Sequence, residues 1–251
     1  MTDFQGFTPA AAQRFFRSLG RHNNKPWFEA NRAGYETAVR EPLRALVEEL
    51  DAAFGTIAPE IIGDPKRSLF RINRDIRFSK DKSPYKTNAG CWFYHQDAGR
   101  GVGQDANDGG AGFYFHIDGK TAFLAGGIWM PSRPSLTKIR DRLADDWRPF
   151  ARMVELPAFR RRFGPIESEA MLTRVPRGFA PDHPAAKWLR FQSVTAGRTV
   201  ASADLLTPKL VGKIARDFEA LVPLVRWLNE SLGYPLQLPR PYGRGGSAWK
   251  K

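Results

Sequence analysis

The chain has 251 residues, of which 42% are hydrophobic, and the net charge is +13. This composition can supply a substantial core, and no stretch approaches the ~20 apolar residues of a membrane-spanning helix. The single cysteine, Cys91, excludes an internal disulfide framework. Because the first residues contain neither a basic leader nor an apolar run, we expect a soluble, cytoplasmic protein with no membrane partner. The positive charge favours polyanions, phosphorylated ligands or acidic surfaces as partners.

The first fifty residues predict helices. Thr8 followed by Pro9 is typical of a helix start, and Asn23 or Asn24 can cap the next helix. Pro42 is expected to open a third helix, because the apolar residues behind it continue a 3.6-residue period. The pattern therefore predicts a helical layer that precedes a sheet.

From residue 68 the hydrophobic period changes to two, which predicts a strand. One face of this strand would carry Phe70, Ile72, Ile76 and Phe78. The other face would carry Arg71, Asn73, Asp75 and Arg77. Further strands are expected at 90–95, 112–117 and 121–130, with Asp118 and Gly119 in a tight turn between the last two. The long, glycine-rich segment between the second and third of these four strands is expected to be a mobile loop.

After Pro131 the pattern returns to helices, one capped by Ser135 and one around residues 147–154. Residues 165–199 contain several prolines and are expected to be mostly irregular, with one strand near 188–194. Thr207 and Pro208 are expected to open an amphipathic C-terminal helix.

These elements predict one α+β domain over residues 1–233, built from a mainly antiparallel sheet covered by N-terminal and C-terminal helices. Residues 234–251 are basic and lack periodicity, so we expect a flexible tail.

The stretch "RINRDIRFSKDKSPYKT", residues 71–87, holds the strongest concentration of basic side chains. Arg74 would lie on the apolar face of its strand, so we expect it to pair with a carboxylate or to lie at a break in the sheet. On the other face, Asp75 between Arg71 and Arg77 would orient both guanidinium groups toward a carboxylate or phosphate.

The loop that follows adds three lysines, and its tyrosine could stack on a ligand or donate a hydrogen bond. The predicted ligand-binding residues are Arg71, Arg74, Arg77, Lys80, Lys82, Tyr85 and Lys86. The same residues could instead form an internal network of ion pairs, or contact a nucleic-acid backbone.

The four histidines show no metal-binding spacing, and we expect neither a metal nor a cofactor. His95 and His116 lie on predicted strands and could meet across the sheet. His116 shares a strand face with Tyr114 and Asp118, which would form a general acid/base cluster if this face meets the cleft of Asp75. Asp75 and His116 are therefore the candidate catalytic residues, although the pattern leaves open whether the protein is an enzyme.

Four stretches together resemble a family of bacterial and fungal proteins known as a domain of unknown function. They are "HNNKPWFEANRAGY" (22–35), "RINRDIRFSKDKSPYKT" (71–87), "GGIWMP" (126–131) and "RVPRGF" (174–179). The similarity extends to about residue 230 and favours one domain over two. It implies no activity, so any function must be inferred from the residues themselves.

Three functions therefore remain open. The first is a pocket for a small phosphorylated or carboxylated ligand, in which Asp75 orients the basic groups or acts as a base. The second is nucleic-acid binding, suggested by the charge and by the mixture of basic and aromatic residues in 188–198. The third is a structural or interaction protein, in which the basic stretch forms a charge network that holds helices onto the sheet.

Overall fold

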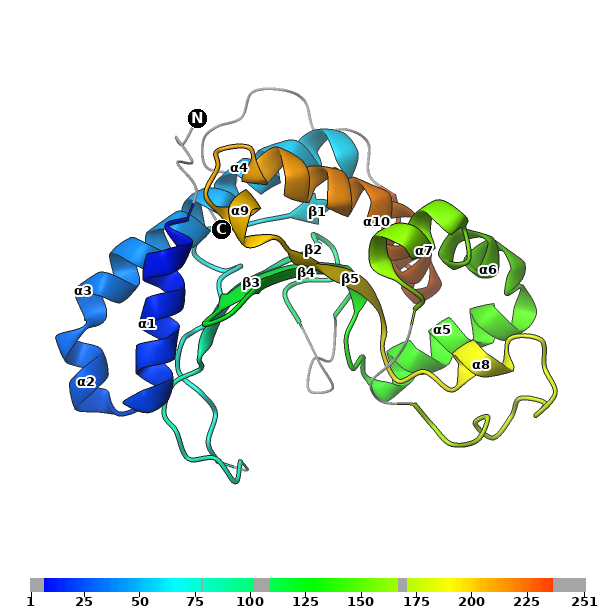
Figure 1. The fold of residues 1–251 in the computed structure, drawn as a ribbon. Coiled ribbons are helices and arrows are strands. Elements are labelled where there is room, and N and C mark those ends of the chain that lie inside the picture. Colours follow the sequence, from blue (N-terminus) through cyan, green and yellow to red (C-terminus); the bar gives the residue numbers. More distant parts are fainter. Residues whose placement is uncertain (1–6, 78, 102–108, 167–170, 237–251) are drawn as a thin grey trace.

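The computed structural model describes residues 7–77, 79–101, 109–166 and 171–236. Five strands form one antiparallel sheet in the order β1-β2-β3-β4-β5. Their bounds are Ile61–Ile62, Asn88–His95, Gly112–Asp118, Ala122–Ile128 and Val194–Val200. Helices accompany the sheet above and at both sides (Figure 1). The predicted α+β fold with an antiparallel sheet is confirmed, and so are the strands expected at 90–95, 112–117 and 121–130.

The core lies between the sheet and two long helices, α4 (Glu41–Ile57) and α10 (Leu210–Leu232), which run over its upper face in Figure 1. Phe54 of α4 stacks on Phe113 of β3 with ring centroids 5.3 Å apart, and on Phe218 of α10 at 5.9 Å. All three side chains are fully buried. Since side chains alternate along a strand, the residues next to Phe113 point to the opposite face, which lies below the sheet in Figure 1. We call this the open face.

The N-terminal helices are α1 (Pro9–Arg21), α2 (Lys25–Ala30) and α3 (Arg32–Tyr35), and a π-helical turn (Glu36–Arg40) links α3 to α4. Asn24 caps α2, as the sequence allowed, because its Oδ1 accepts a hydrogen bond from Trp27 N at 3.0 Å. Pro42 lies in the first turn of α4, where a missing backbone donor is tolerated.

The C-terminal helices are α5 (Arg133–Asp145), α6 (Arg148–Val154), α7 (Pro157–Phe163), α8 (Ala186–Leu189), α9 (Ser202–Leu205) and α10. The predicted cap at Ser135 is wrong, because Ser132 caps α5 and accepts the hydrogen bond from Ser135 N. The strand expected at 188–194 is also misplaced: part of it forms α8, and β5 begins only at Val194. None of the helices in the described ranges is long and apolar enough to cross a membrane. Most of the predicted tail, residues 237–251, lies outside the described residues, as do residues 102–108 of the glycine-rich loop.

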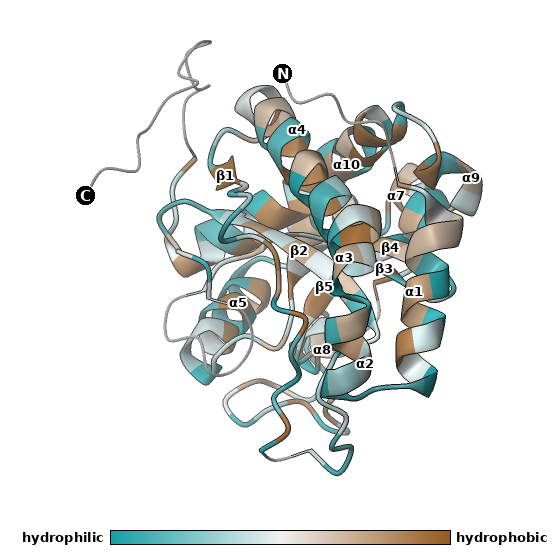
Figure 2. Cartoon of the chain, turned by 90° about the vertical axis from the view of Figure 1, so that its left-hand side faces the viewer, coloured by the Kyte–Doolittle hydropathy of each residue, from teal (hydrophilic) through white to brown (hydrophobic). Residues whose placement is uncertain are grey.

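The strand predicted from residue 68 does not form. Residues 69–77 and 79–87 make an irregular hairpin instead, held by isolated bridges such as Asn73 to Tyr85 and by the hydrogen bond from Arg74 N to Pro84 O at 2.9 Å. This segment, which we call the basic hairpin, leads into β2 and extends past α2 (Figure 1 and Figure 2). Ile76, expected on an apolar face, is 36% exposed, and Phe78 lies outside the described residues. With charged side chains on both faces, the segment has too little apolar surface to bury as a regular strand.

A buried carboxylate ties three elements together. Asp217 of α10 is 1% exposed and accepts hydrogen bonds from Arg162 Nε of α7 at 2.7 Å and from Arg198 Nε of β5 at 3.1 Å. Glu60, which is equally buried, accepts from Arg226 Nε of α10 at 2.6 Å. These pairs fix α10 relative to the sheet and to α7, away from the basic hairpin.

We predict that Asp217→Ala lowers the free energy of unfolding by about 3–5 kcal/mol, because it leaves two guanidinium groups without their shared partner. The control is Glu29→Ala, which removes an exposed carboxylate 2.7 Å from Arg32 and should leave this free energy almost unchanged. Urea unfolding curves of the two variants test this, and similar losses in both would contradict it.

Candidate functional site

Arg77 and Asp75 form a local ion pair near the tip of the basic hairpin. Arg77 Nε lies 3.0 Å from Asp75 Oδ1, and its NH2 group lies 2.7 Å from Oδ2. Hydrogen bonds from the side chain and backbone of Arg77 lower the pKa of Asp75 to about 2. The side chains are 76% and 43% exposed, so this pair is a surface feature. Of the two arginines predicted to flank Asp75, Arg77 bonds to it directly, whereas Arg71 acts on it only through its charge and forms no hydrogen bond or ion pair with any described residue.

Arg74 pairs with Asp81 across the same hairpin, as expected for an arginine that needs a carboxylate partner. Asp81 Oδ1 also accepts hydrogen bonds from Ser83 N at 2.9 Å and from Ser83 Oγ at 2.6 Å. These contacts with Ser83, and then the charge of Arg74, lower the pKa of Asp81. Part of the basic stretch is therefore an internal charge network, which was one of the three open readings.

The remaining predicted residues of the hairpin occupy three different environments. Lys80 is exposed, and Lys82 Nζ donates to Ile76 O at 2.9 Å. Tyr85 is only 5% exposed, and its ring stacks on Phe28 of α2 with centroids 4.2 Å apart. Hydrogen bonds between the side chain of Asn23 and the backbone of Tyr85 hold the hairpin to the helical layer. Tyr85 thus anchors the hairpin to α2, and its buried ring is not accessible to a ligand.

Lys86 lies at the base of the hairpin, where the chain enters β2. Its Nζ is 5.5 Å from the ring centroid of Phe70. Burial lowers the pKa of Lys86, and the positive charges of Arg71 and Arg74 lower it further. No carboxylate contributes to this shift, so the side chain is a half-buried cation next to two other cations.

His116 lies on the open face of the sheet, between Tyr114 and Phe123. The ring centroids are 5.4 Å and 5.7 Å away, respectively. The ring is half-buried, and its Nδ1 is enclosed without a hydrogen-bond partner. Burial lowers the pKa of His116, and the charge of Asp118 opposes this shift only in part. The predicted sharing of one strand face by these β3 residues is confirmed.

The predicted meeting of His95 and His116 is wrong. His95 points to the helix-covered face with Phe93, whereas His116 lies opposite Gly90 on the open face. His95 Nε2 hydrogen-bonds with Pro235 O at 3.0 Å, and its ring stacks on Tyr234 at 5.3 Å. His116 pairs with Gly90, and His95 lies an odd number of positions after Gly90 on β2. Because side chains alternate along a strand, the two histidines lie on opposite sides of the sheet.

The structure links Lys86, rather than Asp75, to His116. Lys86 contacts Phe70, the ring of Phe70 lies 6.1 Å from that of Tyr114, and Tyr114 contacts His116. Within the described residues, no hydrogen bond, ion pair or ring contact joins Asp75 to His116. Sequence reasoning missed the part played by Phe70 and Phe123, because both rings reach the β3 side chains from other segments of the chain, and these contacts depend on the folded structure.

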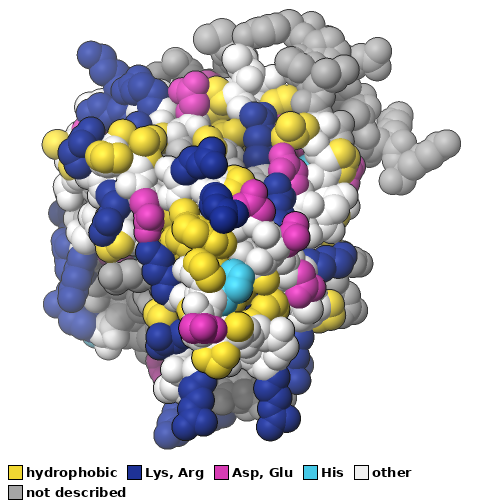
Figure 3. Space-filling view, turned by 90° about the vertical axis from the view of Figure 1, so that its right-hand side faces the viewer, with side chains coloured by type: hydrophobic (Ala, Val, Ile, Leu, Met, Phe, Trp, Pro, Cys, Tyr) yellow, Lys and Arg dark blue, Asp and Glu magenta, His cyan; other side chains and the backbone are white. Residues whose placement is uncertain are grey.

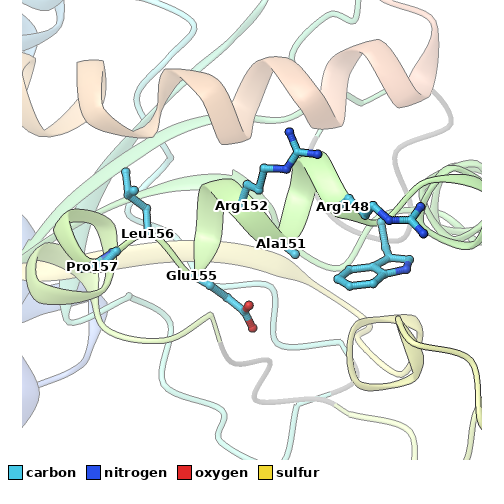
Figure 4. Close-up of a pocket in the computed structure, with 7 residues that line it drawn as sticks. Arg148, Ala151, Arg152, Glu155, Leu156 and Pro157 are labelled. Carbon is cyan, nitrogen blue, oxygen red and sulfur yellow. The ribbon is translucent and has the colours of Figure 1, made fainter.

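An open groove of about 470 Å³ lies elsewhere, along α6 and the start of α7 (Figure 4). It is lined by Trp147, Arg148, Ala151, Arg152, Glu155, Leu156 and Pro157. Glu155 is already paired with Lys187, and Leu156 is 54% exposed. None of the residues predicted from the sequence lines this groove.

A family model described as "Conserved hypothetical protein (DUF2461)" matches residues 11–227. The match includes the basic hairpin and all five strands. Neither the curated proteins nor the solved structures yielded a match.

We predict that Arg77→Gln raises the pKa of Asp75 from about 2 toward 3.8, because it removes the guanidinium donors. Since folding lowers this pKa, the pair stabilises the fold above pH 3.8, and this stabilisation is lost as the pH falls toward 2. Carboxyl NMR titrations of the wild type and of the Arg77→Gln and Arg74→Gln variants measure the shift. Arg74→Gln is the control, and an ordinary Asp75 pKa in the wild type would contradict the pairing.

Proposed function

Because the chain belongs to the family of conserved hypothetical proteins (DUF2461), whose description names no reaction, we propose a function from the geometry. The protein binds a small ligand with a phosphate or carboxylate group, at the junction of the basic hairpin and the open face of the sheet. Lys86 and Arg71 supply the positive charge. Arg74 adds to the local potential while it remains paired with Asp81.

The observation that carries this proposal is the environment of Lys86. Half-burying an ammonium group near two guanidinium groups is unfavourable, as the lowered pKa of Lys86 reflects. A bound anion would remove this penalty by pairing with Lys86 and with Arg71, which forms no ion pair with a described residue. Charge-assisted hydrogen bonds of this kind are stronger than neutral ones, particularly where water is partly excluded.

The tip of the hairpin is a weaker candidate for the same role. The side chain of Arg77 already forms two hydrogen bonds with Asp75, and Arg74 is paired with Asp81. An anion there would have to displace a carboxylate and would lie in open solvent, where ion pairs contribute little. The proposed site therefore uses Lys86 and Arg71 from the predicted set and assigns Arg74 and Arg77 mainly to the hairpin's own structure.

His116 is the residue that would act on a bound ligand if the protein is an enzyme. Its lowered pKa keeps the imidazole neutral near pH 7, the form in which it can accept a proton. Since Asp75 has no contact with it, a catalytic role for Asp75 requires the ligand itself to bridge the two residues.

Nucleic-acid binding is the alternative, favoured by the net charge of +13 and by aromatic rings on a sheet face. On the face drawn in Figure 3, however, acidic side chains stand among the basic ones, which weakens a continuous track for a phosphate backbone. Binding of this kind would weaken steeply with salt and would survive single substitutions.

We predict that the protein binds inorganic pyrophosphate and that Lys86→Met weakens this binding by about 10- to 150-fold, the equivalent of one charge-assisted hydrogen bond. Isothermal titration calorimetry measures the dissociation constants. Lys209→Met is the matched control, because it removes the same charge from an exposed position that precedes α10. Equal affinities for the wild type and for Lys86→Met would contradict the proposed site.

A further inference from the structure

A row of four rings crosses the open face of the sheet and begins at the proposed anion site. The ring of Phe70, beneath Lys86, is 6.1 Å from that of Tyr114, which is 5.4 Å from His116, which in turn is 5.7 Å from Phe123. The three rings on β3 and β4 are half-buried, so each retains an accessible part. The row therefore offers a stacking surface that is continuous with a cluster of positive charge.

Glycines on the neighbouring strands leave room for these rings to lie across the sheet. A Cβ atom added at Gly90 of β2 would lie 3.0 Å from the hydroxyl oxygen of Tyr114 and 3.1 Å from its ring. A Cβ atom added at Gly197 of β5 would lie 2.7 Å from Cζ of Phe123. Tyr114 thus extends over β2 and Phe123 over β5, in opposite directions across the sheet, and neighbouring rings of the row are tilted by 33–61° to one another.

Polar atoms without partners gather on the same face. In the described part of the chain, four enclosed side-chain nitrogen or oxygen atoms lack a hydrogen bond: Trp92 Nε1, Tyr94 OH, His116 Nδ1 and Arg140 Nε. The first three belong to residues on the open face, and Trp92 and Tyr94 are only 5% and 2% exposed. Enclosed polar atoms without partners reduce stability, and native proteins tend to keep them where function requires it.

This inference rests on the proposed anion site. We propose that the ligand is a planar aromatic anion, such as an aryl phosphate, an aromatic carboxylate or a mononucleotide. Its ring stacks on Tyr114, and its charged group pairs with Lys86 and Arg71. His116 lies beside that ring, with Nδ1 enclosed, so its other ring nitrogen, Nε2, is available to hydrogen-bond a substituent of the ligand ring. The ligand ring uses the accessible part of Tyr114, and the anion pairs with Lys86 at the Phe70 end of the row.

The test compares 1-naphthyl phosphate with cyclohexyl phosphate, which carries the same charged group on a ring that is not aromatic. We expect the naphthyl compound to bind more tightly, and we expect Tyr114→Leu to weaken its binding by about 2- to 12-fold. Binding of cyclohexyl phosphate should change little in this variant. Trp147→Leu, which removes a half-buried ring from the groove along α6, is the matched control. Circular dichroism establishes folding, and the difference in affinity between the two compounds for the wild type serves as the test if Tyr114→Leu does not fold.

The outcomes separate this inference from the proposed function. If both phosphates bind with equal affinity and depend on Lys86, but not on Tyr114, stacking of the ligand ring is overturned and the anion site stands. If neither binds in a Lys86-dependent way, both proposals fail. If a dT12 oligonucleotide binds with a steep salt dependence while naphthyl phosphate does not bind, the surface belongs to single-stranded nucleic acid and the small-ligand proposal is overturned.

Discussion

The structure depends on the packing of two long helices against one face of an antiparallel sheet. Phe54, Phe113 and Phe218 meet at the centre of this layer with ring centroids 4.7–5.9 Å apart. Because successive side chains of a strand point to opposite faces, burying Phe113 and Phe115 directs Tyr114 and His116 away from the core. The functional proposal therefore follows from a packing constraint, which places aromatic residues on a face without a covering helix in the described structure (Figure 1).

The charges divide into two groups according to their partners. Asp217 and Glu60 are nearly inaccessible and bind arginines from other elements, so they hold the architecture together. Asp75 and Asp81 are exposed and bind arginines of their own hairpin, so they shape it locally. Lys86 belongs to neither group, since it forms no ion pair with a described residue and the charges that lower its pKa, those of Arg71 and Arg74, are positive. The proposed ligand site rests on this difference within a single basic stretch.

Features that depend on local sequence were predictable. The β2, β3 and β4 strands follow a clear run of apolar and aromatic residues, Asp118 closes its turn by accepting hydrogen bonds from the next backbone donors, and Asn24 caps its helix. The strand expected at residues 68–78 failed because its period of two came with charges on both faces. Whether this segment forms a strand depends on how much of each face can be buried. The alternation of apolar and polar residues alone does not determine this.

The candidate site was predictable only where it depends on local sequence. The sequence identified the basic stretch and the pairing of Arg74 with a carboxylate, but it could not choose Asp81 as the partner or place Tyr85 against Phe28. It also could not predict that Lys86 would lie over Phe70, or that Gly90 and Gly197 would make room for Tyr114 and Phe123. These contacts join residues from different segments of the chain, and those of Gly90 and Gly197 depend on the register of the sheet.

A crystal structure of the protein grown with 1-naphthyl phosphate tests the central claim most directly. The account predicts the phosphate within hydrogen-bond distance of Lys86 Nζ and the naphthyl ring against Tyr114 on the open face. A ligand found instead at the hairpin tip beside Arg77, or in the groove along α6, would contradict it.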